Sequence, residues 1–157
     1  MTAQEHYEKA DALAGQGKWD QAQSHFDKAI LALEETRDDG CVEDSELLAC
    51  AYHGRSMCFF DKMDVQKALM DINAACELNP EDWYIWLHMG NIYGQMKRYE
   101  KALEYHAKGS QLAPDEGILH WCMGVTHEKL GNDAVAERCF KEAEKLGFTE
   151  DDVDRAF

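Results

Sequence analysis

The chain has 157 residues, of which 45% are hydrophobic, and this length and composition suit one globular domain. Its 31 acidic residues outnumber 16 lysine and arginine residues, for a formal net charge of −15. This balance argues against nucleic-acid binding, which needs basic side chains to replace counterions, and it disfavours anionic membranes. The apolar runs are too short for a membrane span, and the N-terminal residues lack the basic start and apolar core of a secretory signal.

The cysteines are spaced irregularly and include no C-x-x-C pair. They are Cys41, Cys50, Cys58, Cys76, Cys122 and Cys139. Without an export signal, we expect reduced thiols and a cytoplasmic protein.

A repeat with a period of 34 residues runs through most of the chain. A shift of 34 places Pro80 on Pro114 and Gly90 on Gly124, and these prolines are the only two in the chain. The same shift aligns Ala68, Ala102 and Ala136. An earlier copy appears at a shift of 46, which aligns Ala22, Phe26 and Ala29 with Ala68, Ile72 and Ala75. The extra residues form either an acidic, turn-rich insert at about 37–48 or an extension of two helices.

This unit resembles the tetratricopeptide repeat in its length and in the order of its characteristic residues. The order is tryptophan, a small residue, an aromatic, alanine, a bulky residue, alanine and proline. The third copy carries Trp86, Met89, Gly90, Tyr93, Tyr99, Ala102, His106, Gly109 and Pro114. The fourth copy departs from the pattern, with His120 in place of the tryptophan and Phe148 in place of the proline. The resemblance implies one all-α domain over 1–157, a right-handed α-α superhelix of four helix pairs. Its parts are repeats at about 3–36, 49–82, 83–116 and 117–148, the insert at 37–48, and a C-terminal capping helix at 149–157.

Each unit is expected to form two antiparallel helices. The predicted helices span 3–16, 19–36, 46–62, 65–78, 83–96, 99–112, 117–130, 133–146 and 149–157. Thr2 with Glu5 predicts a capping box at the first helix, and Thr149 with Asp152 predicts a weaker one at the last helix.

The two prolines mark the seams between units. Pro80 and Pro114 are expected just after the second helix of a unit. Proline cannot continue a helix, but it suits the first turn of the next helix. Gly147 is expected to end the eighth helix. Val153 and Phe157 of the ninth helix would then cover the open end of the stack.

The resemblance also implies a concave groove lined by the first helix of each unit. The residues expected there are Tyr7, His53, Met57, Phe60, Tyr84, Leu87, His88, Asn91, Trp121 and Val125. This mixed and partly apolar lining favours an apolar or amphipathic peptide segment. The alternative is packing against a neighbouring helix, which stays open for Met57, Tyr84 and Trp121 and is preferred for Leu87, Val125 and Phe60.

Some members of the family grip C-terminal carboxylates with a clamp of lysine, asparagine and arginine side chains. The clamp positions here are Tyr7, Asp11, Gly54, Tyr84 and His88. None of them matches, and Asp11 would repel a carboxylate. We therefore expect no carboxylate clamp.

The sequence gives little support for catalysis or metal binding. His53, His88 and Cys122 could face one groove, but ligands on successive helices would lie about 10 Å apart, too far for one zinc ion. No glycine-rich phosphate loop and no G-x-S-x-G motif occurs. A pairing of Cys122 with His88 or His120 stays open, although nothing visibly activates it. We expect no enzyme, no cofactor and no metal.

The favoured function is a protein-interaction module, an adaptor or chaperone-like scaffold that binds a partner segment of apolar or basic character. The first alternative is self-assembly into a homo-oligomer. The second is a chaperone for apolar segments of secreted proteins, which rests only on the small size and acidic character of the chain.

Overall fold

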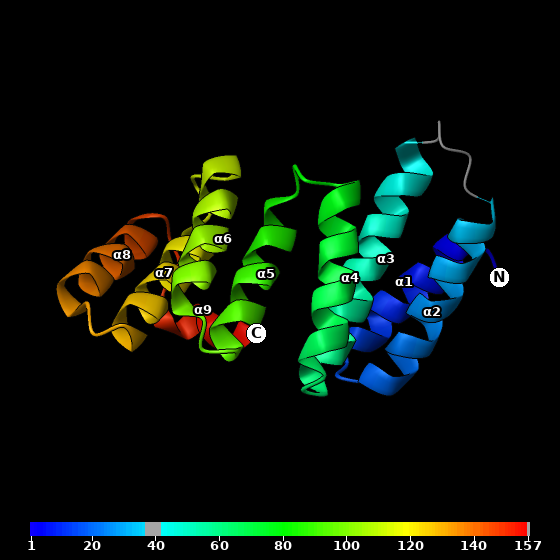
Figure 1. The fold of residues 1–157 in the computed structure, drawn as a ribbon, viewed down its shortest axis with the longest axis horizontal. Helices are drawn as coiled ribbons and strands as arrows, with labels where there is room; N and C mark the ends of the chain where they lie inside the picture. Colours follow the sequence, from blue (N-terminus) through cyan, green and yellow to red (C-terminus); the bar gives the residue numbers. More distant parts are fainter. Residues whose placement is uncertain (37–41, 157) are drawn as a thin grey trace. The chain divides into compact units, whose positions relative to one another are not determined.

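A computed structural model describes residues 1–36 and 42–156 of the chain. The described residues form two compact units, Met1–Pro80 and Glu81–Phe157, and they contain α-helices but no strand (Figure 1). The helices are α1 (Ala3–Ala14), α2 (Trp19–Thr36), α3 (Val42–Asp61), α4 (Val65–Leu78), α5 (Trp83–Gln95), α6 (Tyr99–Leu112), α7 (Gly117–Lys129), α8 (Asp133–Lys145) and α9 (Glu150–Ala156).

The first unit holds α1 to α4, in which each helix packs against the next one and α1 also contacts α3 (Figure 1). Its core includes a cluster of buried side chains with Phe26, Ile30, Leu33 and Leu48 among its members. These side chains are buried because α2 and α3 place their apolar residues at helical spacing on the faces that meet.

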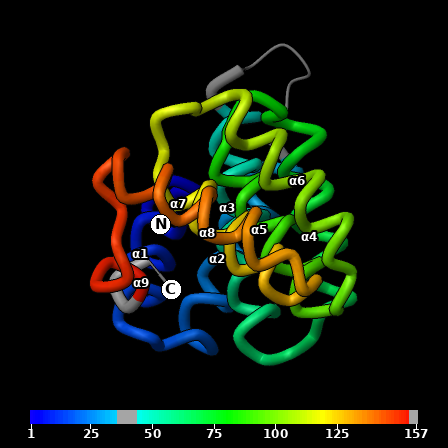
Figure 2. Tube along the Cα trace, turned by 90° about the vertical axis from the view of Figure 1, so that its left-hand side faces the viewer, coloured from blue at the N-terminus to red at the C-terminus, as the bar shows by residue number. Residues whose placement is uncertain are grey.

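The second unit holds α5 to α9, and α5 to α8 pack in the same sequential way, with α5 also touching α7. Leu87, Ile118, Leu119 and Cys122 form a buried cluster between α5 and α7. After α8 the chain turns and enters α9, which is drawn in red in Figure 2.

The turn inside each helix pair has the same backbone geometry in all four repeats. Gly17, Met63, Lys97 and Gly131 each have a positive φ, of 70°, 61°, 59° and 74°. The residue after each of them donates its backbone N–H to a carbonyl five positions earlier, as from Lys18 to Leu13 at 3.0 Å and from Arg98 to Tyr93 at 2.9 Å. The spacing between these turns reproduces the shifts of 46 and 34 in the sequence, which confirms the repeat register.

Small residues allow the two helices of a pair to approach closely. A Cβ atom added to Gly90 would lie 2.3 Å from the His106 ring, and one added to Gly124 would lie 2.5 Å from the Phe140 ring. In both pairs the bulky side chain of the second helix occupies the space above the glycine of the first helix.

The seams between repeats follow the predicted pattern. Asn79 and Ala113, which precede the two prolines, have φ values of −140° and −134°, outside the helical range. Gly147 ends α8 with a φ of 83°, as predicted.

The capping predictions hold at one end fully and at the other in part. The Thr2 hydroxyl accepts from the Glu5 N–H at 3.2 Å, and the Glu5 carboxylate accepts from the Thr2 N–H at 2.7 Å. At α9 the Asp152 carboxylate accepts from both the Thr149 N–H and the Thr149 hydroxyl at 2.9 Å, which is the Asp152 part of the predicted box.

Most predicted helices agree closely with the structure, and the largest difference is at α3. This helix begins at Val42, ahead of the predicted residue 46, and so takes up part of the expected insert. Residues 37–41 of the insert and Phe157 of the cap lie outside the described residues, and the single domain over 1–157 stays a prediction.

Candidate functional site

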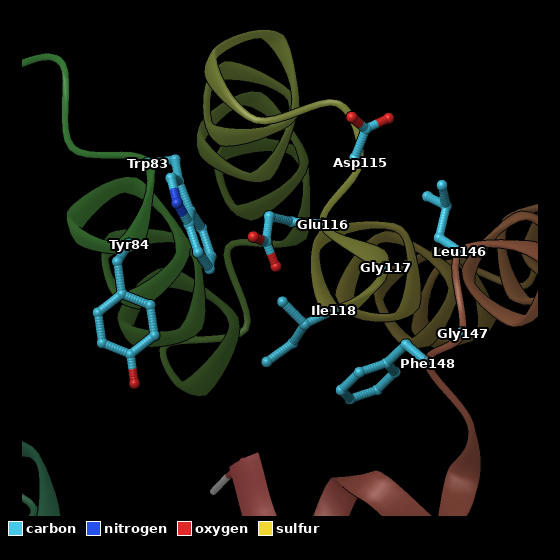
Figure 3. A pocket seen from close by; sticks show the side chains of 9 residues that line it. All are labelled: Trp83, Tyr84, Asp115, Glu116, Gly117, Ile118, Leu146, Gly147 and Phe148. Atoms are coloured by element: carbon cyan, nitrogen blue, oxygen red, sulfur yellow. The ribbon is translucent and has the colours of Figure 1, made fainter.

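A pocket of about 370 Å³ lies in the second unit (Figure 3). Three segments meet there: the first turn of α5, the start of α7 with the residues before it, and the turn that follows α8. Its lining residues are Trp83, Tyr84, Asp115, Glu116, Gly117, Ile118, Leu146, Gly147 and Phe148.

Local sequence features position the three segments. Asp82 caps α5 by accepting from the Tyr84 N–H at 2.9 Å, which fixes the helix start at the pocket. Gly117 allows Phe148 to pack against α7, because a Cβ at Gly117 would lie 2.6 Å from the Phe148 Cβ. The positive φ of Gly147 turns the chain so that Phe148 reaches this position.

The pocket has aromatic and aliphatic walls. The rings of Trp83 and Tyr84 are 5.4 Å apart and nearly perpendicular, at 77°. Ile118 and Phe148 lie across from Trp83 (Figure 3). The Phe148 ring is 5.9 Å from the Trp121 ring, which joins the pocket to the next aromatic residue on α7.

The charged side chains that line the pocket are both acidic. Glu116 places its carboxylate between the Trp83 ring and Ile118, and Asp115 lies further out (Figure 3). No lysine, arginine or histidine is among the described residues that line the pocket.

The predicted groove residues of the second unit differ in accessibility. Tyr84 and Val125 are each 37% exposed, whereas Leu87 is completely buried in the cluster between α5 and α7. Leu87 is thus a core residue, in agreement with the packing alternative. His88 is only 8% exposed and lies 4.6 Å from the Tyr84 ring, edge to face.

Asn91 and Trp121 are half-buried and engaged within the second unit. The Asn91 side-chain oxygen lies 3.1 Å from His106 Nε2, so Asn91 contacts α6 within the helix pair. The Trp121 ring packs 4.7 Å from the Phe140 ring on α8. Of the predicted residues of this unit, Tyr84 is the one that lines the pocket.

The predicted groove residues of the first unit are all half-buried. Tyr7 packs on the core with its ring 6.0 Å from the Phe26 ring. His53, Met57 and Phe60 lie on α3, the first helix of the second repeat.

Two buried cysteines, Cys58 and Cys122, are poor candidates for nucleophilic attack. Burial raises the pKa of Cys122 to about 12 and that of Cys58 to about 11, so neither is a thiolate at neutral pH. Among the described residues, no group of three or more histidine, cysteine, aspartate or glutamate side chains is arranged to hold a metal ion. Cys58, Cys122 and Cys139 are free thiols.

Most of the residues that line the pocket were not predicted from the sequence. Trp83, Glu116 and Phe148 were not predicted as site residues, because they come from three segments separated along the chain. Phe148 did carry a signal, since an aromatic residue stands there at the repeat position of Pro80 and Pro114.

The structure therefore defines an all-α protein of stacked helix pairs with a partly apolar, acidic surface pocket. A family profile described as "Tetratricopeptide repeat" matches residues 84–116. The structure also resembles that of MamA residues 41 to the end from Desulfovibrio magneticus RS-1, with a TM-score of 0.73 and 20% identity over 92% of this chain and 75% of that one. The chain is a member of the tetratricopeptide repeat family, with the fold of an α-α superhelical solenoid.

Two relatives are longer proteins. BBSome complex member BBS4 from Bos taurus is 28% identical over 131 residues, which cover 76% of this chain and 25% of that protein. Tetratricopeptide repeat protein 12 from Mus musculus is 30% identical over 105 residues, which cover 67% of this chain and 14% of that protein. The chain thus spans a quarter or less of the length of these relatives. Within the described residues, no helix is both long and apolar enough to cross a membrane.

Proposed function

We propose that this chain is a protein–protein interaction scaffold whose second unit binds an extended or helical segment of a partner. The observation that carries the proposal is the pocket beside Tyr84, an exposed aromatic residue next to a cavity of about 370 Å³ with apolar walls. Exposed tyrosine and tryptophan side chains beside a pocket are typical anchors of protein interfaces.

The binding surface of the second unit would comprise the pocket, Tyr84 on α5, and Trp121 and Val125 on α7, while His88, a buried residue, packs against Tyr84. Trp121 and Val125 are four positions apart and share one face of their helix. Tyr7, His53, Met57 and Phe60 would form the corresponding surface of the first unit. Leu87 and Asn91 support these surfaces from within instead of contacting a partner.

The surface does not suit recognition of a C-terminal carboxylate. The family's clamp positions carry Tyr7, Asp11, Gly54, Tyr84 and His88, with no lysine or arginine among them. The partner is therefore bound through side chains of apolar or basic character. A cytoplasmic location agrees with the six cysteines and stays part of the proposal.

The proposal can be tested by selecting peptides from a random display library on the purified protein. Binding of the selected peptides to wild type and to Tyr84→Ala would then be measured by fluorescence anisotropy. We expect Tyr84→Ala to weaken binding about 30-fold, since loss of an interface aromatic typically costs about 2 kcal/mol. Tyr84 suits this test better than Trp121, whose ring also packs on Phe140.

The matched control is Leu31→Ala, which truncates an exposed apolar side chain of α2 in the first unit. It should leave the affinity unchanged, and thermal melts should show that both variants remain folded. Equal affinity of Tyr84→Ala and wild type for every selected peptide would refute the proposed surface. The self-assembly alternative predicts a mass by light scattering that rises with protein concentration, and a constant monomer mass would exclude it.

A further inference from the structure

The pocket of the second unit joins an aromatic face to an uncompensated carboxylate. Figure 3 shows the Glu116 side chain directed into the space between the Trp83 ring and Ile118. Glu116 is the N-cap residue of α7, but its side chain accepts no capping hydrogen bond. Its carboxylate therefore keeps its acceptor capacity for a ligand.

The local charge is negative even when the helix dipoles are counted. The N-termini of α5 and α7 both lie at the pocket, and each contributes about +0.5 of a charge. Asp82, Asp115 and Glu116 contribute one negative charge each, so the carboxylates outweigh the two helix ends by about two charges. No basic side chain is among the described lining residues. An anionic ligand is therefore disfavoured.

An uncharged apolar side chain is also a poor occupant. Glu116 is an exposed residue, but an apolar occupant would still displace water from the pocket side of its carboxylate without supplying a hydrogen-bond donor, which is unfavourable for a charged group. A cationic side chain satisfies both features, because its charge pairs with Glu116 and its aliphatic stem packs on Ile118 and Phe148. The face of the Trp83 indole adds a cation–π contact, for which tryptophan is the best aromatic partner.

We propose that this pocket binds the side chain of a lysine or arginine on the partner polypeptide, with Glu116 as its ion-pair partner and Trp83 as its aromatic face. This inference rests on the proposed function, in which the second unit binds a polypeptide segment. The partner segment is therefore expected to carry a basic residue that enters this pocket.

The test uses small probes that need no identified partner. Nα-acetyl-lysine methylamide, the arginine analogue, and the norleucine and glutamate analogues would be titrated into ¹⁵N-labelled protein. Backbone amide shifts of Tyr84, Gly117 and Phe148 would be followed with the Trp83 indole N–H. We expect saturable shifts for the lysine or arginine probe, with a Kd of order 10 mM at low salt, and none for the norleucine and glutamate probes.

Glu116→Gln keeps the shape of the side chain and removes its charge. We expect it to weaken the binding of the cationic probe about threefold, which is the size of effect that an exposed ion pair gives. The matched control is Glu128→Gln, which removes the same charge from an exposed position at the other end of α7, about 18 Å away along the helix axis. This control should bind the probe as wild type does, which separates a local ion pair from the general attraction of an acidic protein.

Two results would overturn the inference: saturation by the norleucine probe at the same concentrations, or equal losses in Glu116→Gln and Glu128→Gln. The failure of the inference differs from that of the proposed function. If selected peptides lose affinity in Tyr84→Ala but carry no basic residue, the interaction surface stands and the cation pocket falls. If the cationic probe saturates the pocket but no peptide depends on Tyr84, the cation pocket stands and the proposed surface falls.

Discussion

The second and third repeats carry chemically different side chains at equivalent repeat positions. In the second repeat, Arg55 pairs with Asp71 through two bonds of 2.7 and 2.8 Å, and it also reaches Asp27 at 2.9 Å. This network joins α2, α3 and α4. The positions 34 residues later are Met89 and Tyr105, so an ion pair in the first unit is replaced by apolar and aromatic contacts in the second.

The aromatic side chains around these positions differ in the same way. In the first unit the Arg55 guanidinium lies 5.4 Å from the Tyr52 ring centre. In the second unit Tyr105 is stacked near Trp86 and Tyr93, with ring centres 6.0 and 5.0 Å away. The repeat therefore needs large side chains at these positions, but their interaction can be either ionic or apolar and aromatic.

The largest expected effect comes from breaking the ion network of the first unit. Arg55→Met should lower the free energy of unfolding by about 3 kcal/mol, because it leaves Asp71, which is 8% exposed, without its partner. Urea denaturation measures the loss, and hydrogen exchange should locate it in α2 to α4. The double variant Arg55→Met with Asp71→Tyr copies the third repeat and should recover most of the stability. A loss below 1 kcal/mol in Arg55→Met, or no recovery in the double variant, would contradict the comparison.

The next effect concerns His106, which occupies in the third repeat the place of Ile72 in the second and Phe140 in the fourth. Burial lowers the pKa of His106 from 6.5 to about 4. The unfolded chain therefore binds a proton that the folded protein rejects, so stability is complete above pH 6.5 and falls as the pH drops towards 4. At about 1.4 kcal/mol per pKa unit, the loss attributable to His106 is about 3 kcal/mol at most, and it is absent at pH 7.

Urea denaturation between pH 7 and pH 4.5 checks this expectation. Carboxylates also contribute to acid unfolding, so the informative quantity is the difference between wild type and His106→Phe, which copies the fourth repeat. The variant should lose less stability than wild type over this range. Parallel pH profiles of the two proteins would rule out His106 as the titrating group.

The smallest effect is a gain of stability at the turns. Lys97 and Met63 have positive φ where the first and fourth repeats carry glycine, and such a conformation costs a non-glycine residue about 1 kcal/mol. Lys97→Gly should therefore raise the free energy of unfolding by about 0.5 kcal/mol, after the greater flexibility of glycine in the unfolded chain is included. The matched opposite change, Gly131→Lys, should be destabilising by a similar amount. Thermal melts compare the two, and a loss of stability in Lys97→Gly would show that the turn geometry does not limit these positions.

The sequence predicted the fold far better than the site. Helix starts and ends depend on neighbouring residues, such as the Thr2–Glu5 box, the prolines at the seams and Gly147, and these features agree with the structure. The predicted start of α3 was four residues too late, because the helix begins at Val42 and not at residue 46. The groove prediction included both Leu87 and Tyr84, with packing preferred for Leu87 and left open for Tyr84, because the repeat pattern does not measure exposure.

The paired helices, their turns and the small residues between them can be predicted from the sequence, because each depends on groups a few residues apart or on a period that repetition makes visible. Tertiary structure alone decided that Leu87 is buried while Tyr84 is exposed, and that Trp83, Glu116 and Phe148 meet around one pocket. The physical reason is that burial and local charge depend on which distant segments approach, and no short-range pattern encodes that approach.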